Sequence, residues 1–189
     1  MHRLFLSIAV LSLVATLAFA ADSTPAPTTA PATAPADGAF RMKAGIDHPF
    51  KDPQGRVWQK QSGFADGDDV AREPDLKIEK TDMPDFYRTE HYDMTSWSTD
   101  LPNGAYTVNL YFCETFDGIA AAGDRVFDVK LGDQQLKNFD IYKEAGGPYK
   151  PLTKTFDDVK VTNGKLKIDF TAKAQSPCIN GIEIIPKKS

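Results

Sequence analysis

The segment Glu114 to Asp124 carries the residues whose types and spacing most suggest chemistry. Glu114 and Asp117 place two carboxylates three positions apart, with the ring of Phe116 between them. Two carboxylates at a defined separation are what glycoside hydrolysis requires. An aromatic ring beside a carboxylate is also suited to binding a sugar without cleaving it, because the ring stacks on C–H faces and the carboxylate accepts from hydroxyls. Glu114 also ends a predicted strand, where hydrogen bonds to the backbone are the simpler role.

Other reactive residues do not form a recognisable catalytic or metal-binding pattern. Neither Asp47-His48 nor Glu90-His91 has metal-ligand spacing, and no Ser or Cys stands in a nucleophile-elbow context. The run Asp66-Gly67-Asp68-Asp69 could hold a structural calcium ion, but it lacks the alternating ligands of a calcium loop. We therefore expect no cofactor, and a structural calcium ion is the one alternative.

Two well-specified strands flank the Glu114–Asp124 loop. From Gly104 to Phe112 apolar and polar side chains alternate, and a second alternating strand is expected from Arg125 to Leu131. A period of two predicts strands with one buried face. The side chains expected on the buried faces are Tyr106, Val108, Leu110, Phe112, Phe127, Val129 and Leu131. A long loop between such strands is a usual place for a binding surface.

The rest of the chain from Phe40 onwards also reads as short strands separated by turns, whereas only Asp68 to Lys80 suggests a short helix. Turn signals occur at Asn103-Gly104, Gly132-Asp133 and Asn163-Gly164. Many short strands with turns between them predict an all-β fold, a β-sandwich or jelly roll. The further strands are expected at Phe40–Ala44, Arg56–Trp58, Phe86–Tyr92, Gln134–Leu136, Phe139–Tyr142, Thr155–Val161, Lys165–Phe170 and Ile179–Ile185.

The chain divides into three parts by composition. Residues 1–20 combine a basic start, an apolar run and an Ala-Phe-Ala cleavage signal, which is typical of a secretory signal peptide. Residues 21–39 are rich in Ala, Pro and Thr and predict a disordered linker. Residues 40–189 have the size of one compact domain. The sequence thus predicts an exported protein, periplasmic or extracellular, with no membrane span after signal cleavage.

The net charge limits the kinds of ligand that the protein can bind, and the cysteine content limits its disulfides. The formal net charge of −4 argues against nucleic acid, which requires a basic stripe. A mildly acidic surface bearing aromatic rings suits neutral sugars better. Cys113 and Cys178 are the only cysteines. An exported setting permits a disulfide between them, and two buried free thiols are the alternative.

Several segments, taken in order, resemble the malectin-like carbohydrate-binding domain family, and together they cover nearly all of Phe40 to Pro186. They are Arg41–Gly45, Asp52–Trp58, Tyr87–Tyr92, Asn103–Val108, Phe112–Glu114, Gly123–Val129, Phe139–Ile141 and Pro177–Ile184. The resemblance implies a galactose-binding-like jelly roll that holds glucose-type disaccharides in a loop-built cleft and has no catalytic activity.

The resemblance also implies which residues line that cleft. Tyr92 matches a family aromatic directly, while Phe64 and Phe116 stand where the family has Tyr. Asp117 stands where an aromatic is expected, and Gln175 where an Asp is expected. The sequence therefore predicts a secreted, non-catalytic module that binds a neutral, glucose-type oligosaccharide through these five residues. A structural or adhesion domain docking a protein partner is the alternative, and a small glycoside hydrolase is a third hypothesis.

Overall fold

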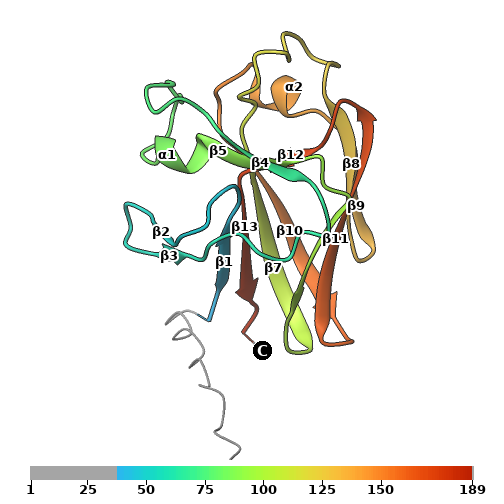
Figure 1. Ribbon diagram of the computed structural model, residues 1–189. Coiled ribbons are helices and arrows are strands. Elements are labelled where there is room, and N and C mark those ends of the chain that lie inside the picture. The colour runs from blue at the N-terminus through green and yellow to red at the C-terminus, as the bar shows by residue number, and fades with distance from the viewer. Residues whose placement is uncertain (1–37, 189) are drawn as a thin grey trace, which may run out of the picture. The chain divides into compact units, whose positions relative to one another are not determined.

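The computed structural model describes residues 38–188 (Figure 1). The predicted signal peptide and nearly all of the predicted linker lie outside this range. Ala39, assigned to the linker from sequence, is buried with 1% of its surface exposed.

Two antiparallel four-stranded sheets form the body of the domain, which confirms the predicted all-β sandwich. One sheet has the order β1-β13-β7-β10 and the other the order β6-β11-β8-β9. The first sheet contains β1 (Phe40–Lys43), β13 (Gly181–Pro186), β7 (Gly104–Phe112) and β10 (Leu152–Val161). The second contains β6 (Ser96–Asp100), β11 (Lys165–Ala174), β8 (Val126–Leu131) and β9 (Gln134–Phe139).

Smaller elements accompany the sandwich, and most gather in the upper part of the domain in Figure 1. A three-stranded sheet has the order β12-β5-β4, and β2 pairs with β3. Their bounds are β4 (Asp68–Ala71), β5 (Thr89–Tyr92), β12 (Cys178–Ile179), β2 (Phe50–Lys51) and β3 (Val57–Trp58). The helices are α1 (Pro84–Tyr87) and α2 (Ile141–Ala145). Strand β1 starts and β13 ends at the opposite, lower end.

The alternation that predicts the strands also builds the core between the two sheets. The predicted inward side chains of β7 and β8 are each at most 6% exposed, and they share one cluster with Leu166, Ile168 and Phe170 of β11. The rings of Phe112, Phe127 and Phe139 meet with centroids 4.9 to 6.3 Å apart. Burial of this apolar surface is the main force that joins the sheets.

The three turn signals have two different roles. Gly132-Asp133 closes a β8–β9 hairpin, because Leu131 pairs with Gln134. The turns at Asn103-Gly104 and Asn163-Gly164 instead carry the chain from one sheet to the other. These two turns bind each other, since the Gly164 N–H donates to Asn103 Oδ1 at 2.8 Å. Sequence shows the turns, but not which strands they join.

Three sequence expectations are corrected by the structure. The predicted helix within Asp68–Lys80 is absent, and residues 68–71 form β4 instead, because they pair along β5. The predicted strand Phe86–Tyr92 begins as helix α1, with Pro84 in its first turn. The predicted strand Phe139–Tyr142 is interrupted by α2, whose cap Asp140 accepts from the Lys143 N–H at 2.9 Å.

The two cysteines are free thiols, so the disulfide allowed by the sequence is not formed. Cys178 lies in the main core cluster, while Cys113 lies in a second cluster with Trp58 and Phe86. Both side chains are fully buried among apolar groups and act as small core residues. Burial raises the pKa of the Cys178 thiol well above its ordinary value, which makes it unreactive.

Candidate ligand-binding site

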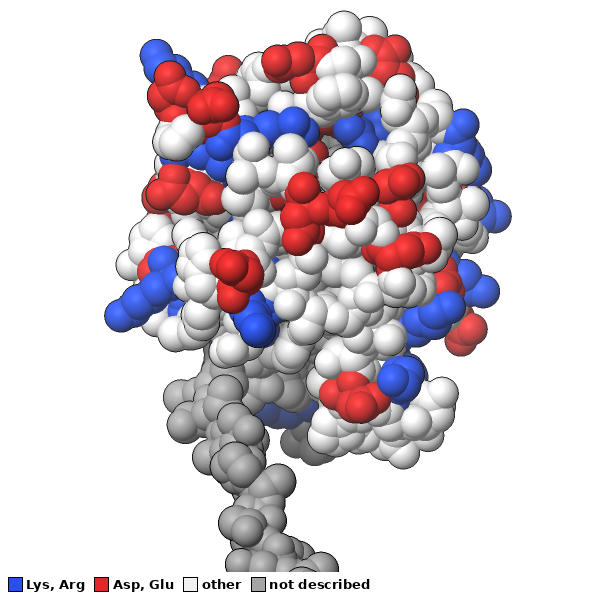
Figure 2. Space-filling model, in the orientation of Figure 1, with Lys and Arg blue, Asp and Glu red and all other residues white. Residues whose placement is uncertain are grey.

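A cleft of about 290 Å³ opens at the loop end of the domain, beside the β12-β5-β4 sheet. Its lining residues come from β4 and the residue after it, from β5, from the β7–β8 loop, and from the turn between β11 and β12. They are Val70, Arg72, Glu90, Tyr92, Phe116, Arg125, Gln175 and Ser176. Figure 2 shows that a row of Asp and Glu side chains crosses this face over β4, with Lys and Arg side chains just above it.

Three side chains that line the cleft can contact a ligand: the rings of Tyr92 and Phe116 and the amide of Gln175. Phe116 is 43% exposed, which is unusual for a ring of its size, and Tyr92 is partly buried. The side chains of Tyr92 and Gln175 make no hydrogen bond to any other residue within 38–188. The cleft thus combines a stacking surface with an unpaired phenol and an unpaired amide.

Phe116 is held in place from several sides. Its N–H donates to Glu114 Oε1 at 3.1 Å, and its carbonyl accepts from the Ile119 N–H at 3.0 Å. The Arg72 guanidinium carbon lies 5.7 Å from the ring centroid, within cation–π range. A Cβ on Gly118 would lie 2.4 Å from the ring carbon Cε1, so the ring fits here only because residue 118 is glycine.

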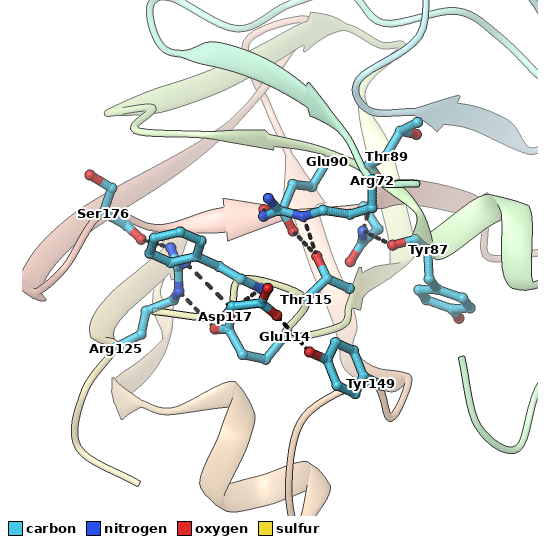
Figure 3. A network of polar contacts seen from close by, with 12 residues as sticks. Arg72, Tyr87, Thr89, Glu90, Glu114, Thr115, Asp117, Arg125, Tyr149 and Ser176 are labelled. Atoms are coloured by element: carbon cyan, nitrogen blue, oxygen red, sulfur yellow. Dashed lines mark hydrogen bonds and ion pairs between the residues drawn. The ribbon is translucent and has the colours of Figure 1, made fainter. Parts of the chain in front are cut away.

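Under the aromatic surface, Arg72, Glu90 and Thr115 form a closed polar network (Figure 3). One Nη atom of Arg72 donates to Glu90 Oε1 at 2.7 Å, and its Nε donates to Thr115 Oγ1 at 3.1 Å. The Thr115 hydroxyl in turn donates to Glu90 Oε2 at 3.2 Å. The second Nη atom of Arg72 has no hydrogen-bond partner within residues 38–188, and Arg72 lines the cleft.

A second buried pair joins Arg125 to Glu114. Arg125 Nε donates to Glu114 Oε2 at 2.8 Å, and its Nη1 atom donates to the Ser176 carbonyl. Burial raises the pKa of the Glu114 carboxyl, while Arg125 and the Phe116 N–H act in the opposite direction. Two guanidinium groups and two carboxylates therefore lie at the base of the cleft and balance each other in charge.

The backbone is strained at one residue that lines the cleft. Six non-glycine residues within 38–188 have left-handed φ, and Gln175 of the cleft is one of them, as is Asp93. The Ser176 hydroxyl donates to Asp93 Oδ1 at 2.6 Å, which fastens the turn that contains Gln175. Such conformations cost free energy and tend to be kept where a side chain must point at a ligand.

Of the five predicted site residues, the structure brings Tyr92, Phe116 and Gln175 together in one cleft. Asp117 lies on the other side of Phe116, where it accepts from the Tyr149 hydroxyl at 2.7 Å. Phe64 does not line the cleft. Its ring stacks on His91 with centroids 3.9 Å apart and packs against the core.

Glu114 and Asp117 do not form a hydrolytic pair in this geometry. Glu114 is completely buried and bound to Arg125, so no substrate reaches it, and Asp117 is exposed and points to Tyr149. Glu114 is better described as a positioning residue that holds both Arg125 and the backbone of Phe116.

Sequence reasoning missed both arginines and Glu90. Arg125 is the first residue of the alternating strand expected at Arg125–Leu131, and Glu90 precedes Tyr92 by two positions on the same strand. Periodicity and motif order place both residues, but nothing local marks either as part of a site. No sequence pattern marks Arg72 as a site residue, because its position depends on the pairing of β4 with β5.

The Asp-rich run does not provide a calcium site in this structure. Asp66 accepts from both the N–H and the hydroxyl of Thr95, and Asp69 contacts His91 Nδ1 at 2.6 Å. Within residues 38–188 no three His, Cys, Asp or Glu side chains gather as a metal-binding group. The same part of the chain contains no helix long and apolar enough to cross a bilayer.

Residues 40–185 match the family model for the malectin domain. This chain belongs to the malectin domain family. Receptor-like protein 4 of Arabidopsis thaliana is 33% identical over 143 residues, which is 68% of this chain and 23% of that protein. A probable LRR receptor-like serine/threonine-protein kinase from the same plant is 37% identical over 122 residues, or 56% of this chain and 12% of the kinase. The chain thus spans less than a quarter of these relatives.

Solved structures share the fold at low sequence identity. The plant receptor-like kinase FER superposes with a TM-score of 0.69 at 19% identity, over 79% of this chain and 49% of that one. A Bacteroides uniformis beta-glucuronidase superposes with a TM-score of 0.70 at 16% identity, over 79% of this chain and 18% of the enzyme. At such identities the likeness establishes the malectin-type β-sandwich and nothing about ligands.

Proposed function

We propose that this malectin domain is a non-catalytic module that binds a neutral, glucose-type oligosaccharide in the cleft between Tyr92 and Phe116. The observation that carries the proposal is the convergence, around one cleft, of a half-exposed ring with the phenol of Tyr92 and the amide of Gln175, which have no hydrogen-bond partner within residues 38–188. Rings stack on the C–H faces of sugars, and the phenol and amide can donate to or accept from their hydroxyls.

The electrostatics of the cleft support a neutral ligand. Arg72 and Arg125 are each bound to a glutamate, so neither is a free cation awaiting an anionic group. Few polar contacts and one or two ring stacks predict weak binding, on the order of micromolar to millimolar.

We further propose that the protein is exported, with residues 1–20 as a signal peptide and 21–39 as a linker. Strand β1 starts at the end of the domain opposite the β12-β5-β4 sheet (Figure 1). The extracellular domains of ANXUR1 and ANXUR2 have similar solved structures, which agrees with an exported setting.

Docking of a protein or peptide is the second candidate function. It is favoured by the exposure of Phe116 and by a similar structure in which FER is in complex with the peptide RALF23 and LLG2. In sugar binding the Phe116 ring contacts a sugar, and in docking it contacts a protein or peptide. One set of variants therefore tests both functions.

The test is a glycan array with the full chain, followed by calorimetry on each hit with Tyr92→Ala and Phe116→Ala. Each substitution should weaken binding by roughly 1–3 kcal/mol, because it removes one stacking ring. Val57→Ala is the matched control, since Val57 is 45% exposed on β3 and lies outside the cleft. A silent array from folded protein would favour docking, and cleavage of a bound glycan would favour a hydrolase.

A further inference from the structure

A second hollow, of about 380 Å³, lies on the other side of Phe116 from the cleft. The two hollows share Arg72 and Phe116, so these two side chains form a ridge between them. The second hollow is also lined by Glu73, Asp75, Leu76 and Asp117. Each hollow is close to the lower limit of ordinary small-ligand pockets, about 300–1,000 Å³.

We propose that the second hollow is a further sugar subsite, and that one oligosaccharide chain crosses the Phe116 ridge and occupies both hollows. This inference rests on the proposed function of the cleft. It assigns to Asp117 the role of binding sugar hydroxyls in the second subsite, separate from the Tyr92 and Gln175 side of the ridge.

The chemistry of the second hollow suits a neutral polyhydroxyl ligand. Its three carboxylates are exposed, and only one oxygen of Asp117 is engaged, by the Tyr149 hydroxyl. Carboxylate oxygens accept from sugar hydroxyls, while Leu76 and the Phe116 ring provide apolar surface for a sugar face. With three carboxylates and one guanidinium already paired to Glu90, the hollow disfavours an anionic ligand.

The walls of the second hollow are already fixed by hydrogen bonds. The Leu76 carbonyl accepts from Arg88 Nε at 2.9 Å, and the Arg72 N–H donates to the Arg88 carbonyl at 2.7 Å. Tyr149 is fastened on both sides, since its N–H donates to the Glu114 carbonyl and its own carbonyl accepts from the Glu79 N–H, each at 2.8 Å. A preformed wall lowers the entropy cost of binding.

The first experiment is amide NMR of the isotope-labelled full chain, titrated with maltose, maltohexaose, cellobiose and cellohexaose. We expect a disaccharide to shift signals around Tyr92 and Gln175, and the hexasaccharide of the same linkage to shift those of Leu76 and Asp117 as well. Shifts confined to the Tyr92 side with every oligomer would overturn the second subsite and leave the proposed function standing. No shifts with any oligomer would overturn both.

The second experiment separates the subsites by affinity. Asp117→Ala should weaken hexasaccharide binding about tenfold, as expected for loss of hydrogen bonds to a charged group, and leave the disaccharide unchanged. Gln175→Ala should weaken both oligomers, and Asp133→Ala, in the β8–β9 turn, should weaken neither. Tyr149→Phe removes only the hydrogen bond to Asp117 and should keep hexasaccharide affinity. Equal losses in Asp117→Ala and Tyr149→Phe would show that loop order, not sugar contact, is the cause, and would overturn the proposal.

Discussion

The two ends of this domain are held together in different ways. In the sandwich, apolar side chains of two sheets meet in a single cluster, with rings such as Phe112 and Phe127 completely buried. At the loop end, Thr115 of the β7–β8 loop is hydrogen-bonded to Glu90 of β5 and to Arg72, and the buried Arg72–Glu90 and Arg125–Glu114 pairs hold the two sides of this contact. Apolar contacts adapt to any close packing, whereas charged hydrogen bonds require particular atoms at particular positions. The core therefore provides stability, and the loop end provides a fixed arrangement of side chains.

The largest loss of stability should come from removing a side chain from the core. Phe127→Ala removes a fully buried ring that contacts Phe112 and Phe139, and should lower the free energy of unfolding by about 3–5 kcal/mol. Denaturant unfolding measures this loss. Phe116→Ala is the control, because its ring is at the surface and its removal should cost less than about 1 kcal/mol. Similar losses in both variants would contradict the division between core and site.

The second-largest loss of stability should come from breaking one buried charge pair. Arg125→Met leaves the Glu114 carboxylate buried without its guanidinium and should lower the free energy of unfolding by about 3 kcal/mol. Adding Glu114→Leu removes the stranded charge and should restore most of that stability. It should not restore ligand binding, because the Phe116 N–H loses its anchor. A double variant as unstable as Arg125→Met alone would show that the pair does more than balance charge.

Lys43 offers a test of charge burial through pH. Its side chain is fully buried, and burial holds its pKa well below the ordinary value of 10.5, although Glu90 and Asp69 oppose this. Between the lowered and the ordinary pKa the unfolded chain binds more protons, so stability rises with pH in that window and falls as pH drops through the lowered pKa.

Lys43→Met should remove this slope and stabilise the fold below the window by about 1–2 kcal/mol. Neither carbonyl that binds Lys43 is stranded, because the Ala44 carbonyl also accepts from Thr89 Oγ1 and the Thr89 carbonyl from Asn180 Nδ2. Denaturant unfolding of both proteins across alkaline pH measures the difference. Parallel profiles for the two proteins would refute it.

The smallest change in stability should come from Gly118→Ala. The new Cβ would lie 2.4 Å from the Phe116 ring, so the ring must turn away, but it is at the surface and this should cost less than about 1 kcal/mol. The amide signals of Phe116 and Asp117 should move, and sugar affinity should fall. Gly104→Ala is the control, since a Cβ there meets nothing closer than 3.7 Å. Unchanged signals in Gly118→Ala would mean that glycine does not position the ring.

Much of the sandwich is predictable because the alternation of apolar and polar side chains shows which face of a strand is buried. The inward faces of β7, β8 and β11 follow from the sequence pattern alone, and the Gly132-Asp133 hairpin follows from its turn residues. The errors came where local pattern was weak. Residues 68–71 became a strand only through pairing with β5, and α1 and α2 begin at Pro84 and after Asp140 inside stretches that resemble strands.

The all-β fold, the buried faces of its strands and the loop that exposes Phe116 follow from the amino-acid sequence, since these features depend on neighbours within a few positions. The arrangement of the site follows from long-range contacts. Arg72 and Arg125, far apart in sequence, lie at one cleft. Phe64 stacks on His91 outside the cleft, and Asp117 lies on the far side of the Phe116 ridge. Such placements depend on which strands pair across the chain and on which buried charge finds which partner. No single segment of the sequence contains that information.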